Sequence, residues 1–221
     1  MASAADWARD TLAVTLSDPH LLERALTHKS AGTDNFERLE FLGDRVLGSS
    51  IAAWLYETFP AESEGKLTRR FAKLVSRETC ATVARTLGIP QQVRLGAQAR
   101  SDGGTESDNI LGDVMEALIG AIWLDQGDRA ASDFVRRAWA SQLSSAGQAP
   151  KHPKSAVQEW AAAKNLKDPV YELLKRSGPH HAPQFHVALT VAPHAAVEAT
   201  GNSKQDAETQ AAQTFLEMIG E

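Results

Sequence analysis

The sequence has little of several features that would otherwise narrow its class. It carries one cysteine, Cys80, in 221 residues, which excludes an intrachain disulfide framework and a zinc site built from several cysteines. No apolar run approaches the roughly 20 residues that a membrane-spanning helix requires, and residues 1–9 hold no apolar signal-peptide core. We therefore expect a protein of the reducing cytoplasm that has no membrane partner.

An excess of positive charge is also missing. The formal net charge is −5 at pH 7, and hydrophobic residues make up 43% of the chain. The hydrophobic content is ordinary for a soluble globular protein, while the charge excludes a uniformly basic nucleic-acid binder but not a local basic surface. The length suffices for one large domain or two small ones.

What the sequence does have is an acidic strip in an apolar stretch, residues 37–47. If this stretch is a helix, at about 100° per residue, then Glu37, Glu40 and Asp44 fall within an arc of roughly 60°. A second arc, roughly 150° away, is apolar. It consists of Leu39, Leu42 and Val46. Like charges on one strip repel each other, so we expect solvent, basic side chains or a divalent metal ion to neutralise them.

A second strip repeats this pattern in a helix expected over residues 110–125. Asp113 and Glu116 are neighbours on one face, and the opposite arc is apolar. That arc holds Leu111, Val114, Met115, Leu118 and Ile122. Gly112 and Gly120 lie beside the acids, where the absence of a side chain lets another helix or a substrate backbone come close.

Packing the two helices side by side would gather four carboxylates, which we call the acidic cluster: Glu40, Asp44, Asp113 and Glu116. Ligands with oxygen alone suit magnesium or manganese, and no histidine lies on either strip to favour zinc. Alternatively, the acids lie on exposed faces and pair with Arg38, Arg45 or lysines. Two strips with apolar surroundings weaken this alternative, although periodicity alone does not decide between the two.

The rest of the chain divides into a helical part and a mixed part. Besides the two acidic helices, expected at 36–59 and 110–125 with Asp108 or Asn109 as the cap of the second, the pattern predicts further helices. They cover residues 6–16, 19–27, 66–74, 76–87 and 128–144, with a turn at 61–65 and a loop at 88–104. Residues 144–150 contain no large apolar side chain and are typical of a linker.

Beyond the linker the pattern changes. Residues 155–164 and 203–219 have helical periodicity, while 170–176, 184–191 and 195–200 alternate as strands do. We therefore expect an all-α domain at 1–144, a flexible linker at 145–153 and a small α+β domain of order α-β-β-β-α at 154–221.

Three segments resemble a known family. Residues 37–47 (ERLEFLGDRVL), 25–30 (ALTHKS) and 111–121 (LGDVMEALIGA) are similar to motifs of bacterial ribonuclease III, and the C-terminal part resembles a double-stranded-RNA-binding domain. The resemblance implies an endoribonuclease that hydrolyses double-stranded RNA with Mg²⁺, for which Mn²⁺ substitutes. It also implies 5′-phosphate and 3′-hydroxyl ends with two-nucleotide 3′ overhangs, and processing of ribosomal RNA precursors and some messenger RNAs.

The resemblance also assigns roles to residues of this chain. The acidic cluster would bind the metal, with Asp44 and Glu116 the most critical for catalysis, while Glu37 and Glu64 would line the cleavage valley. Family members are homodimers, and Phe41 matches a residue that inserts into the partner subunit. Its helical position, away from the apolar arc, agrees with this role. Packing within its own subunit is the alternative.

For RNA binding, the resemblance implies contacts by Gln158 in the first helix of the C-terminal domain, by His181 in the following loop and by Lys204 at the start of the last helix. Residues 150–221, however, hold seven lysines and arginines against eight acidic residues, a balance of −1. Since sequence-independent binding depends on phosphate neutralisation, we expect this domain to bind weakly by itself, with histidines adding charge below about pH 6.5.

Two other functions remain to be weighed. A protein that binds duplex RNA without cutting it would be expected to have lost some of the acids, and none is missing. A di-iron carboxylate oxidase uses Glu-x-x-His pairs, but Gly43 and Ile119 stand three residues after Glu40 and Glu116. The sequence thus favours the nuclease.

Overall fold

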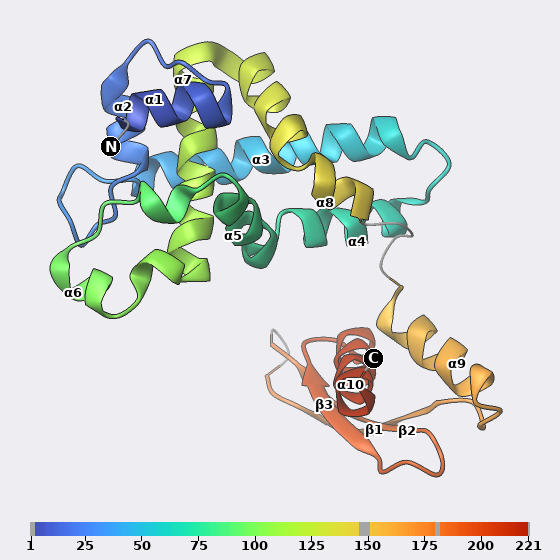
Figure 1. Ribbon diagram of the computed structural model, residues 1–221. Helices are drawn as coiled ribbons and strands as arrows, with labels where there is room; N and C mark the ends of the chain where they lie inside the picture. Colours follow the sequence, from blue (N-terminus) through green and yellow to red (C-terminus); the bar gives the residue numbers. More distant parts are fainter. Residues whose placement is uncertain (1–2, 146–150, 180–181, 221) are drawn as a thin grey trace. The chain divides into compact units, whose positions relative to one another are not determined.

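The computed structural model describes residues 3–145, 151–179 and 182–220. The chain divides into two compact units, residues 1–150 and 151–221, and each is considered by itself (Figure 1). Of the expected linker at 145–153, residues 146–150 lie outside the described ranges.

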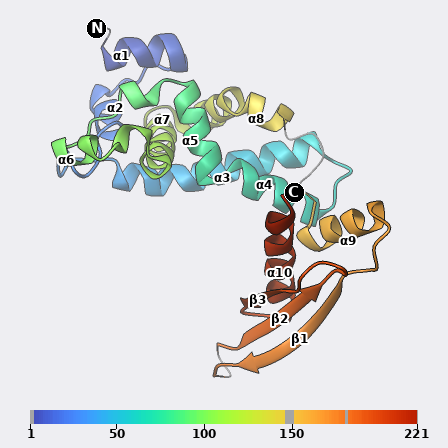
Figure 2. The ribbon, with the colours of Figure 1, turned by 60° about the horizontal axis from the view of Figure 1, so that its bottom comes forward.

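The first unit is built from helices, as expected. They are α1 (Ala4–Trp7), the π-helical turn η1 (Ala8–Leu12), α2 (Pro19–Ala25), α3 (Glu37–Thr58), α4 (Glu64–Leu74), α5 (Arg77–Thr86), the 3₁₀ turn η2 (Ile89–Gln91), α6 (Ala97–Ser101), the 3₁₀ turn η3 (Gly104–Glu106), α7 (Asp108–Ala138) and α8 (Ala140–Ser145). Helix α7 crosses α3 in Figure 1, and the rotated view in Figure 2 again shows the two helices side by side.

Local chemistry explains where several of these helices begin and end. The side chain of Asp18 accepts a hydrogen bond from the His20 backbone, and Pro19 takes the first position of α2, as its sequence predicts. At the start of α3, Asn35 Oδ1 accepts a hydrogen bond of 3.0 Å from the Glu37 backbone N–H. Helix α3 ends just before Phe59 and Pro60, because proline cannot continue the hydrogen-bond ladder.

The structure corrects some expected boundaries. The segment 88–104, expected to be a loop, contains η2 and α6, and Glu64 is the first residue of α4 rather than part of a turn. By contrast, the break expected at Gly127 is present as a bend inside α7: glycine there takes a non-helical φ of 84° and ψ of 179°, and a helical course resumes after it. The N-cap of α7 is Ser107, since Asp108 and Asn109 already lie in the helix.

One core unites the first unit. Buried apolar side chains from α3 and α7 form its centre, with contributions from the surrounding helices. Those of α3 are Leu39, Val46, Leu47, Ile51 and Leu55, and those of α7 include Leu111, Val114, Met115, Leu118 and Ile122. Thus the arcs expected to be apolar are buried, apart from the half-buried Leu42. Trp139 is also buried and donates from Nε1 to the Leu74 carbonyl oxygen at 2.8 Å.

The second unit has the expected α-β-β-β-α order. It consists of α9 (Pro153–Ala163), β1 (Val170–Ser177), β2 (Gln184–Thr190), β3 (Val197–Gly201) and α10 (Lys204–Ile219). The strands form an antiparallel sheet in the order β1-β2-β3. Both helices share one core with the sheet, in which Val157, Leu189 and Phe215 are buried.

Within the described ranges, none of the helices combines the length and apolar character that crossing a membrane demands.

Candidate active site

Two glycines let α3 and α7 cross at backbone contact. A Cβ atom placed on Gly43 would lie 1.7 Å from the main-chain oxygen of Glu116, and one on Gly120 would lie 2.3 Å from that of Leu39. No side chain fits at either position. The two helices therefore cross where the acids stand, and Figure 1 shows α7 passing α3 in the first half of α3.

At this crossing the four acids of the acidic cluster lie close enough for their charges to interact. Burial raises the pKa of Glu116 to about 8, and the charges of Asp44, Asp113 and Glu40 add to the increase. Burial likewise raises the pKa of Asp113. For Glu40, burial is again the largest cause of a raised pKa, followed by repulsion from Asp113 and Glu37. The carboxylates thus form one group of partly desolvated, mutually repelling charges.

The donor chemistry of the cluster fits a hard divalent cation. All of its donors are carboxylate oxygens, which Mg²⁺ and Mn²⁺ prefer, and a cation would relieve the repulsion that raises these pKa values. Among the described residues, no three acidic, histidine or cysteine side chains come close enough together in this structure to hold one metal ion. One reason is that Asp44 pairs with the guanidinium of Arg45.

Arg45 also links the cluster to the neighbouring aromatic residue. Its guanidinium carbon lies 4.6 Å from the centre of the Phe41 ring, while the same side chain pairs with Asp44. Asp44 nevertheless makes the largest charge contribution to the raised pKa of Glu116, so it acts on that acid while it is paired with Arg45. The alternative expectation that arginine pairs with the acids therefore holds for Asp44.

The two further acids occupy different places. Glu37 is exposed at the edge of the cluster, 3.3 Å from Lys29 Nζ, and its charge contributes to the raised pKa of Glu40. Glu64 is also exposed, and its Oε1 accepts a hydrogen bond of 2.8 Å from Thr68. In the described part of the chain, no hydrogen bond or ion pair joins Glu64 to the cluster.

Sequence reasoning missed two polar neighbours of the cluster, Arg77 and Asn109. Arg77 Nη1 donates a hydrogen bond of 3.0 Å to Asn109 Oδ1, and its charge partly offsets the raised pKa values of Glu40, Asp113 and Glu116. No local pattern relates Arg77 to residues more than thirty positions away. The spacing of Asn109, Asp113 and Glu116 on one helix face was the available signal.

An exposed apolar patch adjoins the acidic strip of α3. Phe41 is 66% exposed and Leu124 52% exposed, so Phe41 does not pack inside its own subunit. A surface cavity of about 500 Å³ lies between them, lined by Arg24, Glu37, Arg38, Leu39, Phe41, Leu42 and Leu124. Exposed aromatic and aliphatic side chains around a concavity are typical of an interaction surface.

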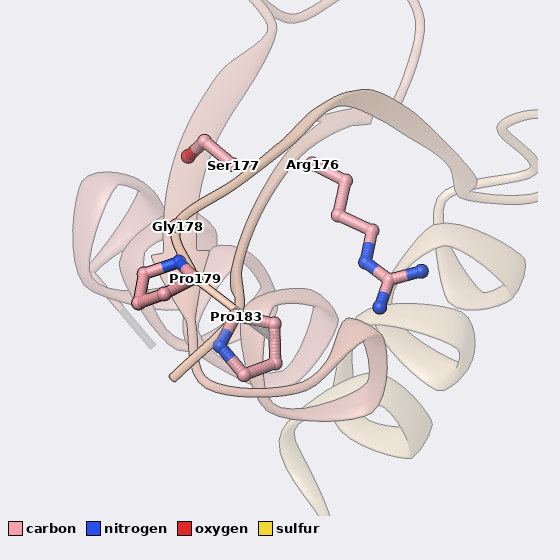
Figure 3. A pocket seen from close by; sticks show the side chains of 5 residues that line it. All are labelled: Arg176, Ser177, Gly178, Pro179 and Pro183. Atoms are coloured by element: carbon pink, nitrogen blue, oxygen red, sulfur yellow. The ribbon is translucent and has the colours of Figure 1, made fainter. Parts of the chain in front are cut away.

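The expected RNA contacts lie on the second unit. Gln158 is exposed on α9, and Lys204 is the exposed first residue of α10. His181 lies outside the described residues. The connection of β1 and β2 forms a small cavity of about 180 Å³ lined by Arg176, Ser177, Gly178, Pro179 and Pro183. Figure 3 shows the Arg176 side chain extending on the opposite side of this loop from Ser177 and Pro179.

Several basic side chains of the second unit form ion pairs with acidic neighbours. Lys154 Nζ lies 2.5 Å and Lys204 Nζ 3.8 Å from the carboxylate of Glu208, and Lys151 pairs with Glu159. The free positive charge of this unit is therefore smaller than its lysine count suggests.

Two of its histidines also have partners within the unit. His186 lies 2.9 Å from Glu198, and the ring of His194 packs 5.2 Å from that of Trp160.

Fold and site together define a class: a helical domain with paired carboxylate strips, followed by an α-β-β-β-α domain. A ribonuclease-III-like family model matches residues 18–143, and a double-stranded RNA binding motif matches residues 153–219. The chain therefore belongs to the ribonuclease III family, and it is an endoribonuclease specific for double-stranded RNA.

Individual relatives agree with this assignment. Ribonuclease 3 of Zymomonas mobilis is 52% identical over 97% of this chain and 87% of its own length. Ribonuclease 3 of Rhodopseudomonas palustris is 45% identical over 93% of this chain and 78% of its own. Among solved structures, the nuclease domain of the Campylobacter jejuni enzyme matches with a TM-score of 0.61 at 34% identity, covering 63% of this chain and 98% of that domain.

Proposed function

We propose that the acidic cluster holds Mg²⁺, or Mn²⁺ in its place, and is the centre at which this enzyme hydrolyses the RNA backbone. The main support for this proposal is that two carboxylate strips meet at the α3–α7 crossing, where burial and mutual repulsion raise the pKa of Glu116 to about 8. Such a group of charges favours a divalent cation over the empty state.

The bound metal would supply activation of water and stabilisation of the charge that develops on the phosphate. The residues of the chain would bind the metal and line the valley for the RNA. Asp44 and Glu116 are proposed as the most critical ligands, and the charge of Asp44 is, after burial, the largest cause of the raised pKa of Glu116. Asp113 and Glu40 complete the ligand set, and Glu37 and Glu64 line the valley in which the duplex lies.

We infer a homodimer in which each subunit cuts one strand, leaving 5′-phosphate and 3′-hydroxyl ends with two-nucleotide 3′ overhangs. The exposed Phe41 and the cavity beside it support this assembly, since a largely exposed aromatic side chain lies next to a concave surface that includes Leu39, Leu42 and Leu124. The Campylobacter jejuni nuclease domain is described as having a flexible region involved in dimer formation. Here Phe41 is proposed to enter the cavity of the partner subunit.

The second unit is proposed to anchor the duplex through Gln158, His181 and Lys204. We propose domains at 1–144 and 154–221 joined by a flexible linker at 145–153. Such a linker would let the second unit follow the RNA while the nuclease dimer cuts. Precursors of ribosomal RNA and some messenger RNAs, encountered in the cytoplasm, are the proposed substrates.

The test is cleavage of a long RNA duplex with Mg²⁺ by the native enzyme, by Glu116→Gln and by the control Asp133→Asn. Asp133 is an exposed carboxylate on the same helix, beyond the bend at Gly127. We expect short duplexes with two-nucleotide 3′ overhangs from the native enzyme and the control, and none from Glu116→Gln. Equal products from all three proteins would refute the assigned site, whereas blunt ends would refute only the proposed geometry.

A further inference from the structure

Arg77 is anchored beside the acidic cluster by two contacts with α7. Its aliphatic stem packs over Gly112, where an added Cβ would lie 3.3 Å from Arg77 Cγ. Its Nη1 donates a hydrogen bond of 3.0 Å to Asn109 Oδ1. Asn109, Asp113 and Glu116 are spaced i, i+4 and i+7, so the amide shares a helix face with two of the acids. The guanidinium is thus held one turn from the cluster.

The charge of Arg77 has no acidic partner at close range. Throughout the described ranges, no carboxylate lies within ion-pair distance of it, and its partner is the neutral amide of Asn109. Arg85, two turns further along α5, shows the contrast, because its Nη2 lies 2.5 Å from Asp108 Oδ1. Two arginines of one helix thus approach the amino end of α7, and only Arg85 is neutralised.

A guanidinium in this state is suited to phosphate. It presents five N–H donors in a fixed fork that matches two phosphate oxygens, and Asn109 uses one of its nitrogens. The side chain is exposed, so a phosphate can reach the remaining donors. The chain as a whole is acidic. Each accessible, positively charged side chain next to the cluster therefore strengthens the binding of a polyanionic substrate.

We propose that Arg77, oriented by Asn109, binds a backbone phosphate of the RNA strand that lies over the acidic cluster. The inference rests on the proposed function of the cluster and adds a substrate contact to it. A purely structural role, in which Arg77 only offsets the repulsion among the acids, is the competing explanation. The two differ in the size of a measurable effect, because a phosphate contact contributes a full counterion-release increment to the salt dependence of RNA binding, whereas a charge that only offsets the acids contributes less.

The experiment measures binding of a long RNA duplex to the full chain at several salt concentrations without divalent metal, in a Glu116→Gln background. The slope of log K against log salt is negative, and one lost phosphate contact reduces its magnitude by about 0.9 in the relation established for duplex DNA. We expect this decrease for Arg77→Gln together with a several-fold loss of affinity at fixed salt. Arg77→Lys keeps the charge and should retain most of the slope while losing affinity.

Two further variants make the result specific. Asn109→Asp creates a carboxylate beside Arg77 and should reproduce the slope of Arg77→Gln although the arginine is still present. Arg129→Gln removes an exposed arginine of α7 beyond the bend and should leave the slope unchanged. Thermal melting of each protein establishes that it is folded.

An unchanged slope in folded Arg77→Gln overturns the proposal, as does an equal decrease in Arg129→Gln. The Glu116→Gln background separates this outcome from the proposed function. If that variant still cuts RNA with Mg²⁺, the assigned catalytic site fails, whereas the slopes decide the role of Arg77 alone.

Discussion

The Cα of Gly43 faces the main-chain oxygen of Glu116 so closely that a methyl group on Gly43 would lie 1.7 Å from it. That oxygen belongs to the backbone of α7 and cannot rotate away as a side chain would. The crossing that gathers the acidic cluster thus depends on a residue that contributes no functional group.

The first prediction concerns this contact. Gly43→Ala should separate α3 from α7, lower the free energy of unfolding by about 3 kcal/mol or more and abolish cleavage. Gly48→Ala is the matched control on the same helix, because its Cβ would lie an ordinary 3.6 Å from Phe71. It should be neutral or stabilising by up to ~1 kcal/mol. Urea denaturation of both variants checks this, and similar midpoints would contradict it.

The second prediction concerns the repulsion within the cluster. Adding Mg²⁺ should raise the melting temperature of the protein, because an ion that binds only the folded state adds about 2.7 kcal/mol at one hundred times its dissociation constant. Glu116→Gln should lose most of this increase, and Asp133→Asn should keep it. Differential scanning calorimetry with and without Mg²⁺ measures the effect. A full increase in Glu116→Gln would place the ion elsewhere.

The third prediction follows from the pair of Glu62 and the buried Arg70. Arg70 donates from Nε and Nη2 to both carboxylate oxygens of Glu62 at 2.8 Å, and these hydrogen bonds lower the pKa of Glu62 below 4.5. An acid with a lowered folded-state pKa stabilises the protein above its unfolded pKa, and this contribution is lost as pH falls through the folded-state value.

Glu62→Gln should therefore melt a few degrees below the native protein at pH 7, and the difference should shrink as the pH falls below about 4.5. Glu57→Gln is a suitable control, since Glu57 pairs with Arg136 at the surface and such pairs contribute little. A difference for Glu62→Gln that stays constant down to pH 3 would show that the ion pair is not its cause.

The fourth prediction concerns the start of α10. Lys204 shares Glu208 with Lys154, and the next residue, Gln205, is neutral and exposed. Gln205→Lys should add one phosphate contact, so that the slope of log K against log salt for duplex binding by the full chain steepens by about 0.9. Gln213→Lys, an exposed position further along the same helix, should not change the slope. Equal slopes for both variants would argue against this helix end as the contact.

The sequence was sufficient to predict the helical and α-β-β-β-α parts and the convergence of the two acidic strips, because helical periodicity fixes which residues share a face. It did not show that Gly43 makes the crossing possible, since a glycine in an apolar run carries no sign of what faces it. Arg77 was missed for a related reason: it reaches the cluster only through the packing of α5 on α7. The cap expected at Asp108 or Asn109 was wrong because α7 already begins at Asp108, so that Ser107 is its N-cap. The side chains of Asp108 and Asn109 bind Arg85 and Arg77 instead.

The last prediction concerns Phe41. Phe41 is 66% exposed beside a cavity lined by both apolar and charged side chains. In the proposed dimer, an aromatic anchor in a partner's pocket contributes about 2 kcal/mol or more, on the order of a hot spot. Phe41→Ala should therefore weaken dimerisation by roughly thirtyfold or more. Tyr56→Ala removes a 75% exposed aromatic ring from the same helix and should leave the dimer intact. Sedimentation equilibrium of both variants measures the dissociation constants. Equal weakening by both would assign the dimer surface to the whole of α3, and unchanged association of Phe41→Ala would remove Phe41 from the interface.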